Sequence, residues 1–565
     1  MDGLPLTKTV RGLVATLAIL GLSAGAAEFY VSPQGDDGAE GSATKPWRTI
    51  QRAARVAAAG DVVTIHAGVY REWVKPAQAG REGAPIVYRA APGEKVVITG
   101  ADEVRGWVKR ADGLWEVRLA YDTFGGFNPF TDALCGMWYR AKRPVLRTRL
   151  IQAGQRLVLH DRAAFVAKEG LAAVLKVGHA ALLAGPVSGT IVARFAQDPS
   201  VAVPELVVRP ACFYPLVEFR DYQTLRGLSF VNAGPTWGSA SAQQVGVVGT
   251  HWSRGWVIED CTVSGSSADG ISLGKHGDEW DNAEPETAPA FVKTIKRAEA
   301  RGMSRTGHHT IRRCTITDCA ECGIHGALGC NFAVVEDCWV SYCNWKQPYS
   351  GSDNGGIKFL GSVDSVIARN HIHHCGAEAG IWLDWMAQGT RVVGNVLWCN
   401  HHDLFVEVSY GPVLVEGNAF LSSRSVRAWS QGIAFVGNRI WGGFELKDEL
   451  VRSTPLFEPH SLTVRAHEFA PVKAGGYVFI NNILARPPDF KRTSLPSRFE
   501  KENNWIVPPA NWKGDESNGN AWVRAPKDNP PPAFKPVTPE RLGTAPAINQ
   551  PYPAPTVSQP NLASW

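Results

Sequence analysis

The chain has 565 residues, of which 44% are hydrophobic and 20% charged. This balance excludes a disordered chain, and length alone suggests about three to five compact domains. The formal charge of +5 is spread without any run of basic residues, which argues against a nucleic-acid partner. The 20 tryptophans are unusually many for a chain of this size and hint at contacts with sugars.

Residues 1–26 have the pattern of a secretory signal peptide. Lys8 and Arg11 precede an apolar run at residues 13–22, and small residues follow at 24–26. The run is shorter than the ~20 apolar residues of a membrane-spanning helix, and no later segment reaches that length. We therefore expect an exported protein, periplasmic or extracellular, with no membrane span.

Residues 27–100 predict a cap followed by the first turns of a solenoid. A strand opens at residues 29–33, and an amphipathic stretch at residues 46–59 predicts a helix that covers one apolar end. Strand-like runs follow at residues 61–65 and 86–89.

Residues 101–215 interrupt this pattern. Their alternating runs, at residues 114–119, 156–159 and 190–195, predict an inserted antiparallel β-sandwich. A strand at residues 225–230 then resumes the solenoid.

Residues 216–505 contain a repeat. A short strand that ends in Cys or Asn recurs at spacings that include 20 to 25 residues, and a second short strand follows it. Alternation in the second strands places Ile357, Ile381 and Leu404 on one face and Lys358, Asp384 and Glu407 on the other. These features predict an all-β fold, a right-handed parallel β-helix of the pectate-lyase type, in which several hundred residues form one domain. The repeating first strands end at Cys261, Cys314, Cys338, Asn370, Asn395, Asn418 and Asn438.

Two other segments fall outside the repeat. A polar loop at residues 275–306, with a helical piece at residues 288–300, is expected between two turns of the solenoid. The proline-rich segment at residues 506–565 is expected to be an extended C-terminal tail.

The cysteines repeat with the strands, which favours stacking in the core over disulfides or a metal site. Their number, 11, is odd, and Cys319 and Cys322 form a lone pair with no second pair at zinc-ligand spacing. Histidine doublets at residues 373–374 and 401–402 are expected to point apart. We expect no metal and no cofactor.

Asp384 and Glu407 are the candidate catalytic pair. They lie 23 residues apart, one turn of the repeat, at matching places on the outward face. Adjacent parallel strands are ~4.8 Å apart, so the two carboxyl groups would be about 5–5.5 Å apart. At that distance one carboxylate attacks a sugar carbon while the other protonates the leaving oxygen, with net retention of configuration. Outward carboxylates are also common on solenoids without any catalytic role.

Aromatic residues surround this pair in the sequence. Trp382 and Trp385 flank Asp384, and Phe405 and Tyr410 flank Glu407. Such rings stack on sugars, and they desolvate carboxyl groups, which would raise the pKa of one acid so that it stays protonated near neutrality.

Four further residues are candidates for substrate contact. Lys358 would bind a sugar hydroxyl or steady a carboxylate, and Asp353 would accept from a hydroxyl, although a solvated lysine and a turn-forming aspartate are equal alternatives. His251 and Trp252 would line the cleft, although a lone histidine is more often structural.

Several motifs closely resemble family 120 of the glycoside hydrolases, whose activity is β-xylosidase. They span the mature chain to about residue 440. These motifs are GGFNPF at 125–130, GVVGTHWSRGW at 246–256, GGIKF at 355–359, GIWLDWMAQGTRV at 380–392, DLFVEV at 403–408 and WSQG at 429–432.

The resemblance implies a β-helix with an associated β-sandwich and a retaining mechanism, with Asp384 as nucleophile and Glu407 as general acid/base. It also implies that Gln431, in the last motif, contacts the substrate. The chain departs from the family at Asp353, where Glu is frequent, and at Leu360, where His is common. These departures bear on the sugar accepted at the non-reducing end.

The sequence thus predicts a secreted retaining exo-glycosidase that acts on xylo-oligosaccharides. It leaves open a β-helix glycosidase for fucosides or arabinosides, a β-helix polysaccharide lyase, and a non-catalytic carbohydrate-binding solenoid. A lyase usually needs clustered acids for calcium and a cationic base, and no such cluster is visible in the sequence. Whether the protein forms a homo-oligomer is also left open.

Overall fold

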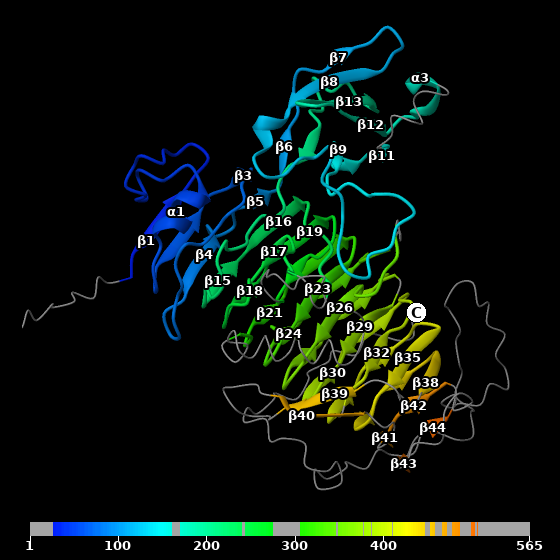
Figure 1. Ribbon diagram of the computed structural model, residues 1–565. Helices are drawn as coiled ribbons and strands as arrows, with labels where there is room; N and C mark the ends of the chain where they lie inside the picture. The colour runs from blue at the N-terminus through cyan, green and yellow to red at the C-terminus, as the bar shows by residue number, and fades with distance from the viewer. Residues whose placement is uncertain are drawn as a thin grey trace, which may run out of the picture.

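The structure is a computed structural model, shown in Figure 1. It describes residues 26–160, 170–239, 243–274, 306–345, 349–376, 378–385, 387–409, 411–446, 453–457, 466–471, 477–485, 499–502 and 505–506.

Three long parallel sheets wind around one axis and form a parallel β-helix (Figure 1). The first sheet has 13 described strands, in the order β1 (Glu28–Val31), β2 (Val62–Ile65), β4 (Ile86–Ala90), β15 (Gln223–Arg226), β18 (Val257–Glu259), β21 (Thr310–Arg312), β24 (Val334–Glu336), β27 (Val366–Ala368), β30 (Thr390–Val393), β33 (Val413–Glu416), β36 (Ile433–Val436), β41 (Tyr477–Ile480) and β43 (Phe499–Glu502).

The second sheet has 12 described strands, in the order β3 (Gly68–Tyr70), β5 (Val96–Thr99), β16 (Leu228–Ala233), β19 (Thr262–Ser266), β22 (Thr315–Cys319), β25 (Trp339–Ser341), β28 (His371–His373), β31 (Val396–Trp398), β34 (Ala419–Phe420), β37 (Arg439–Ile440), β42 (Ile483–Leu484) and β44 (Trp505–Ile506). The third sheet has eight, in the order β17 (Val248–Gly249), β20 (Ile271–Ser272), β23 (Cys322–Ala327), β26 (Gly355–Leu360), β29 (Ala379–Asp384), β32 (Leu404–Glu407), β35 (Arg424–Trp429) and β38 (Gly443–Leu446).

Each complete turn therefore has three strands, where the sequence pattern indicated two. The missed strand, in the second sheet, is separated from the first by a sharp corner of only a few residues. At one such corner Asp260 has φ 57°, and at another Gly227 has φ 69°. Because the corner is so short, the predicted strand at residues 225–230 is in fact two strands, β15 and β16.

The inward faces of the strands share one hydrophobic core that runs along the solenoid. The residues predicted to face inward, including Ile357, Ile381 and Leu404, belong to this core and are fully buried. The prediction of an all-β parallel β-helix is therefore confirmed.

The repeated Cys and Asn residues form a column at the corner between the first and second sheets. The side-chain amide of Asn395 donates to Oδ1 of Asn418 at 2.9 Å, and Asn418 donates to Oδ1 of Asn438 at 3.0 Å. Asn418 also donates to the carbonyl of Val392 at 2.8 Å, so the column satisfies backbone groups inside the corner. All eleven cysteines are free; nine are buried, as the predicted core stacking requires, and Cys135 and Cys399 are exposed.

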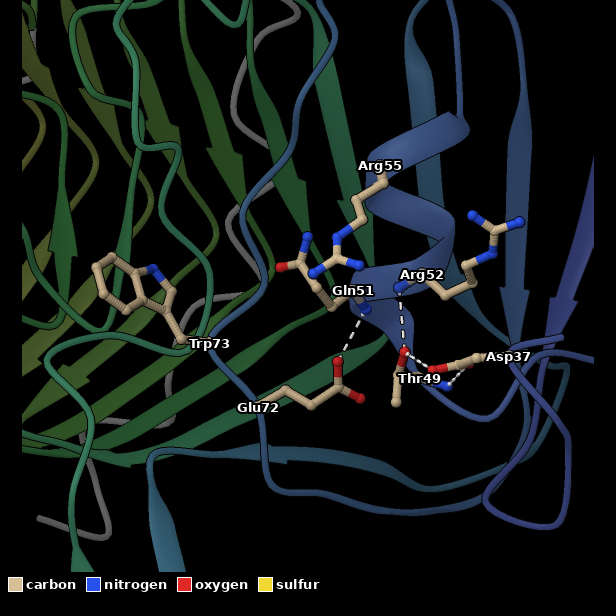
Figure 2. Close-up of a pocket in the computed structure, with 7 residues that line it drawn as sticks. All are labelled: Asp37, Thr49, Gln51, Arg52, Arg55, Glu72 and Trp73. Carbon is tan, nitrogen blue, oxygen red and sulfur yellow. Dashed lines mark hydrogen bonds between the residues drawn. The ribbon is translucent and has the colours of Figure 1, made fainter. Parts of the chain in front are cut away.

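The N-terminal cap is a single helix, α1 (Ile50–Val56), shorter than the predicted segment at residues 46–59. Its buried residues Ile50, Ala53 and Ala54 belong to the solenoid core, so the helix closes the apolar end. Figure 2 shows the cavity beside it, of about 550 Å³, where Glu72 accepts from the N–H of Gln51 at 2.8 Å. The acids in this cavity thus bind the start of the helix.

The inserted region forms two sheets that enclose a separate core (Figure 1). One sheet has the order β10 (Gln155–Arg156), β9 (Leu150–Gln152), β14 (Glu205–Val207) and β6 (Ala101–Glu103). The other has the order β11 (Val158–His160), β12 (His179–Ala184), β13 (Ser188–Arg194), β8 (Trp115–Ala120) and β7 (Val108–Lys109). The pairing is antiparallel except between β11 and β12.

The remaining elements are minor. A 3-10 helix (Tyr121–Phe124) and α3 (Leu171–Val174) lie in the insertion, and β39 (Ser453–Phe457) pairs with β40 (Ala466–Pro471). Among the described residues, no helix is long and apolar enough to cross a membrane.

Three predicted segments fall outside the described residues almost entirely. They are the signal peptide, the helical piece at residues 288–300 and the proline-rich tail.

Candidate active site

Asp384 and Glu407 lie side by side at the ends of neighbouring strands. They are register partners where β29 pairs with β32, as the spacing of 23 residues predicts. The backbone ladder therefore holds their Cα atoms one inter-strand spacing apart, about 4.8 Å. Their side chains emerge on the same outer face because parallel partners point the same way.

Lys358 connects Asp384 to Asp353. Its ammonium group forms an ion pair with Asp353 and lies 3.0 Å from Oδ2 of Asp384. It also lies 4.4 Å from the ring centroid of Trp382, its register partner. Of the three interpretations of Lys358, a solvated side chain does not fit its complete burial, and its contacts favour the one in which it steadies a carboxylate.

The outward position of these residues does not expose them to solvent. Lys358 and Asp353 are 0% and 1% exposed, and Asp384 and Glu407 are 8% and 6% exposed. A buried carboxylate without a partner is unfavourable, so a nearby cation is expected where Asp353 and Asp384 approach each other. Lys358 provides that compensation.

Aromatic rings form a wall beside the two acids. Trp382 stacks on Phe405 with ring centroids 5.3 Å apart, and Phe405 contacts Trp429 edge-on at 5.2 Å. Trp385 follows Asp384 and is 9% exposed. Tyr410, expected beside Glu407, lies outside the described residues.

Three further polar residues at this wall were missed by the sequence analysis. Arg427 lies over the rings of Phe405 and Trp429, and its guanidinium is 3.6 Å from the carboxylate of Glu378. Burial raises the pKa of Glu378. Glu445 accepts from the indole N–H of Trp429 at 3.4 Å.

The register contained the signal for two of these residues. Arg427 is the partner of Phe405, and Glu445 is the partner of Arg427. Trp382 and Phe405 are outward-facing register partners, and following the same position over the next two turns leads to Arg427 and then Glu445.

His251 and Trp252 lie elsewhere. They follow β17, which is four strands from β29 in the same sheet, a distance of about 19 Å. Nδ1 of His251 donates to the carbonyl of Pro215 at 2.7 Å, and its ring stacks on Tyr214. Only an extended ligand would contact both His251 and Asp384.

Gln431 lies two residues after Trp429, the register partner of Glu407. Its backbone N–H donates to the carbonyl of Ser409 at 3.1 Å. Gln431 therefore stands on the turn next to the catalytic pair.

One buried cluster offers metal-ligand chemistry. Ligand atoms of Asp269, Cys322 and His325 lie within 4.8 Å of one another. However, Nδ1 of His325 is 3.0 Å from Asp269, and the thiol of Cys322 donates to the carbonyl of Asp353 at 3.1 Å. The cluster lies on the turn next to Lys358, which is the register partner of His325.

Comparison with known proteins identifies the family. A family model described as the right handed beta helix region matches residues 245–440. The structure of XylC in complex with xylose is 31% identical, with a TM-score of 0.77, and the match covers 85% of this chain and 86% of that one. The chain belongs to family 120 of the glycoside hydrolases. It is a carbohydrate-active β-helix protein of the glycosidase type.

Two further relatives match only short segments. An uncharacterized protein, YwoF of Bacillus subtilis, is 45% identical over 72 residues, and Pectate lyase PEL9 of Emericella nidulans is 38% identical over 79 residues. The matches span 15% and 19% of those proteins.

Proposed function

We propose that the protein is a retaining exo-β-xylosidase that acts on xylo-oligosaccharides. The observation that supports this most directly is the register pairing of Asp384 with Glu407. Register partners have Cα atoms only about 4.8 Å apart, which supports a short separation of the two carboxyl groups as in a double displacement; an inverting enzyme needs room for a water molecule between its two acids.

In the proposed mechanism, Asp384 attacks the anomeric carbon while Glu407 protonates the glycosidic oxygen as the leaving group departs. Water then attacks the glycosyl-enzyme, and Glu407 accepts its proton as a general base. Lys358 acts as a positioning residue that orients Asp384 through the contact at 3.0 Å. Trp382 and Phe405 exclude water from the reacting groups.

The xylose assignment rests on the similarity to XylC, whose structure contains xylose. Leu360 is relevant to this assignment because it is the register partner of Asp384 on the preceding turn, where the family commonly has His. A leucine there gives an apolar contact where an imidazole would bind a hydroxyl. A panel of nitrophenyl glycosides tests the sugar, and β-xyloside should be the preferred member over fucoside and arabinoside.

The catalytic roles are tested by substitution. Asp384→Asn should reduce turnover by at least about 1,000-fold while thermal unfolding is unchanged, because the amide cannot attack. Glu407→Ala with added azide should give a glycosyl azide of retained configuration. An inverted azide would refute the double displacement, and an unsaturated uronate absorbance among the products would indicate a lyase instead.

We also propose that residues 1–26 direct export. Sequencing the N-terminus of protein recovered from the periplasm or medium should find a start at or near residue 27. A chain that starts at Met1 in those fractions would contradict the proposal.

A further inference from the structure

A group of aromatic side chains lies on the outer face of the second sheet, away from Asp384 and Glu407. Among the described residues, the exposed aromatic side chains are Trp339, Tyr342 and Trp345, which are 43%, 43% and 47% exposed. Large exposed apolar groups that cluster in this way mark interaction sites. The aromatic patch is defined by Trp339, Tyr342, Trp345, His371, His374 and Trp398.

The backbone register leaves one face of Trp339 uncovered. On one side its partner is His371, and the two rings stack with centroids 5.3 Å apart and planes inclined by 14°. On the other side its partner is Thr315, whose side chain is too short to cover an indole. The sheet therefore holds a flat, rigid ring surface open to solvent, with a hydroxyl group beside it.

The patch continues along the strand direction. Tyr342 stacks on His374 with centroids 5.0 Å apart, and Trp345 meets His374 edge-on at 4.7 Å. Trp339 and Tyr342 are joined through His373, whose ring lies 5.1 Å and 5.5 Å from theirs. Three residues of strand span about 10 Å, so the surface is longer than one ring.

The rings carry no charge at neutral pH. Burial lowers the pKa of His373 to about 4, and it also lowers the pKa of His371 and His374. An anionic ligand would gain no attraction from these side chains. A pyranose is complementary to them, because its C–H face is apolar and its hydroxyl groups point outward to bond with groups such as Thr315.

We propose that the aromatic patch is a second carbohydrate-binding site, which holds an uncharged polysaccharide chain outside the catalytic region. The segment that joins β25 to β26 begins at Tyr342, in the patch, and contains Asp353, beside Lys358. Both sites are thus built on the same turns, on neighbouring faces of the solenoid. Binding at the patch requires no bond cleavage and does not depend on which sugar is hydrolysed.

Affinity electrophoresis of the full chain tests the site, with soluble arabinoxylan, mixed-linkage β-glucan or galactomannan in the gel and polygalacturonate as a charged comparison. The wild type should be retarded by at least one uncharged polymer. Trp339→Ala and Trp345→Ala should each weaken that retardation by about threefold to tenfold, because each removes one stacking surface. Trp339→Phe, which keeps a ring, should stay close to the wild type.

The controls separate this site from catalysis and from folding. Hydrolysis of a nitrophenyl glycoside should be unchanged in both alanine variants, and Val201→Ala, at an 83% exposed position of the insertion, should bind like the wild type. Asp384→Asn should lose hydrolysis and keep retardation, so the two proposals fail separately. A double variant combines Trp339→Ala with Trp345→Ala. The proposal is overturned if no uncharged polymer retards the wild type, if the double variant binds normally, or if sedimentation shows that the double variant dissociates an oligomer.

Discussion

At the scale of single residues, the candidate site contains one buried cation between two carboxylates. Lys358 contacts Asp353 and Asp384 and is fully buried. Removing the cation would leave two carboxylates without a counter-charge in a region without water, whereas removing the charge of Asp384 would leave the Lys358–Asp353 pair intact. We therefore expect Lys358 both to stabilise the fold and to orient Asp384, and a double variant can distinguish these two effects.

We expect Lys358→Met to reduce kcat by about 100-fold or more and to destabilise the fold by about 3–5 kcal/mol, because two carboxylates would then face each other unpaired. The double variant Asp353→Asn with Lys358→Met removes one negative charge together with the cation. It should recover most of the melting temperature and little of kcat. Recovery of both would show that Lys358 acts only on stability.

At the scale of the elements, asparagine side chains stabilise the corner between the first and second sheets. They form hydrogen bonds with backbone N–H and carbonyl groups that have no strand partner there. Asn418 is 1% exposed, and it accepts from the N–H and the amide of Asn395 while donating to Val392 and Asn438. Cysteine occupies the same column at Cys338, where the thiol makes weak contacts to the carbonyls of Glu336 at 3.3 Å and Ile311 at 3.7 Å.

We therefore expect Asn418→Ala to lower the free energy of unfolding by about 2–4 kcal/mol, since several buried groups lose their partners. Cys338→Ala, a matched change in the same column, should lower it by about 1 kcal/mol, mainly through lost packing. Chemical denaturation of both variants checks the difference. Equal losses would mean that packing, and not hydrogen bonding, determines the stability of the corner.

The repeat made the fold predictable, and the corners limited that prediction. Inward residues such as Ile381 follow from alternation, and the Cys and Asn residues mark one corner of each turn from Cys261 onward. The second sheet was missed because a left-handed residue such as Asp260 turns the chain without interrupting the apolar pattern. The pairing of Asp384 with Glu407 was predictable from spacing because register in parallel strands is periodic. The pairing of Lys358 with Asp353 was not, since Asp353 lies in a loop outside the period.

At the scale of the whole molecule, buried neutral histidines couple stability to pH. Burial lowers the pKa of His309 and His402 to about 3 and that of His308 to about 4. In the unfolded chain these groups titrate near 6.5, so below that pH the unfolded state binds more protons and stability falls. Asp403 acts in the opposite sense, because burial raises its pKa to about 7 and the folded state then binds the extra proton.

Among the described residues, burial lowers the pKa of seven histidines and raises the pKa of four acids, so we expect the free energy of unfolding to rise from pH 5 to about pH 6.5. His309→Asn should reduce this slope by about 1.4 kcal/mol per pH unit, because the titrating ring is lost while an oxygen can still accept from the N–H of Trp256. At pH 8 the histidine is neutral in both the folded and the unfolded chain, so the free energy of unfolding measured there gives the effect of the substitution that is independent of pH. An unchanged slope in the variant would contradict the role of His309.

The stacking of Asp384 on Glu407 has an evolutionary consequence. Their separation is determined by the ladder between β29 and β32, so it does not depend on any loop. A turn of the solenoid gained or lost before residue 384 or after residue 407 would lengthen or shorten the surface offered to a ligand and leave the reacting distance unchanged. In this architecture, the length of the substrate-facing surface can diverge among descendants while the reaction itself is inherited intact.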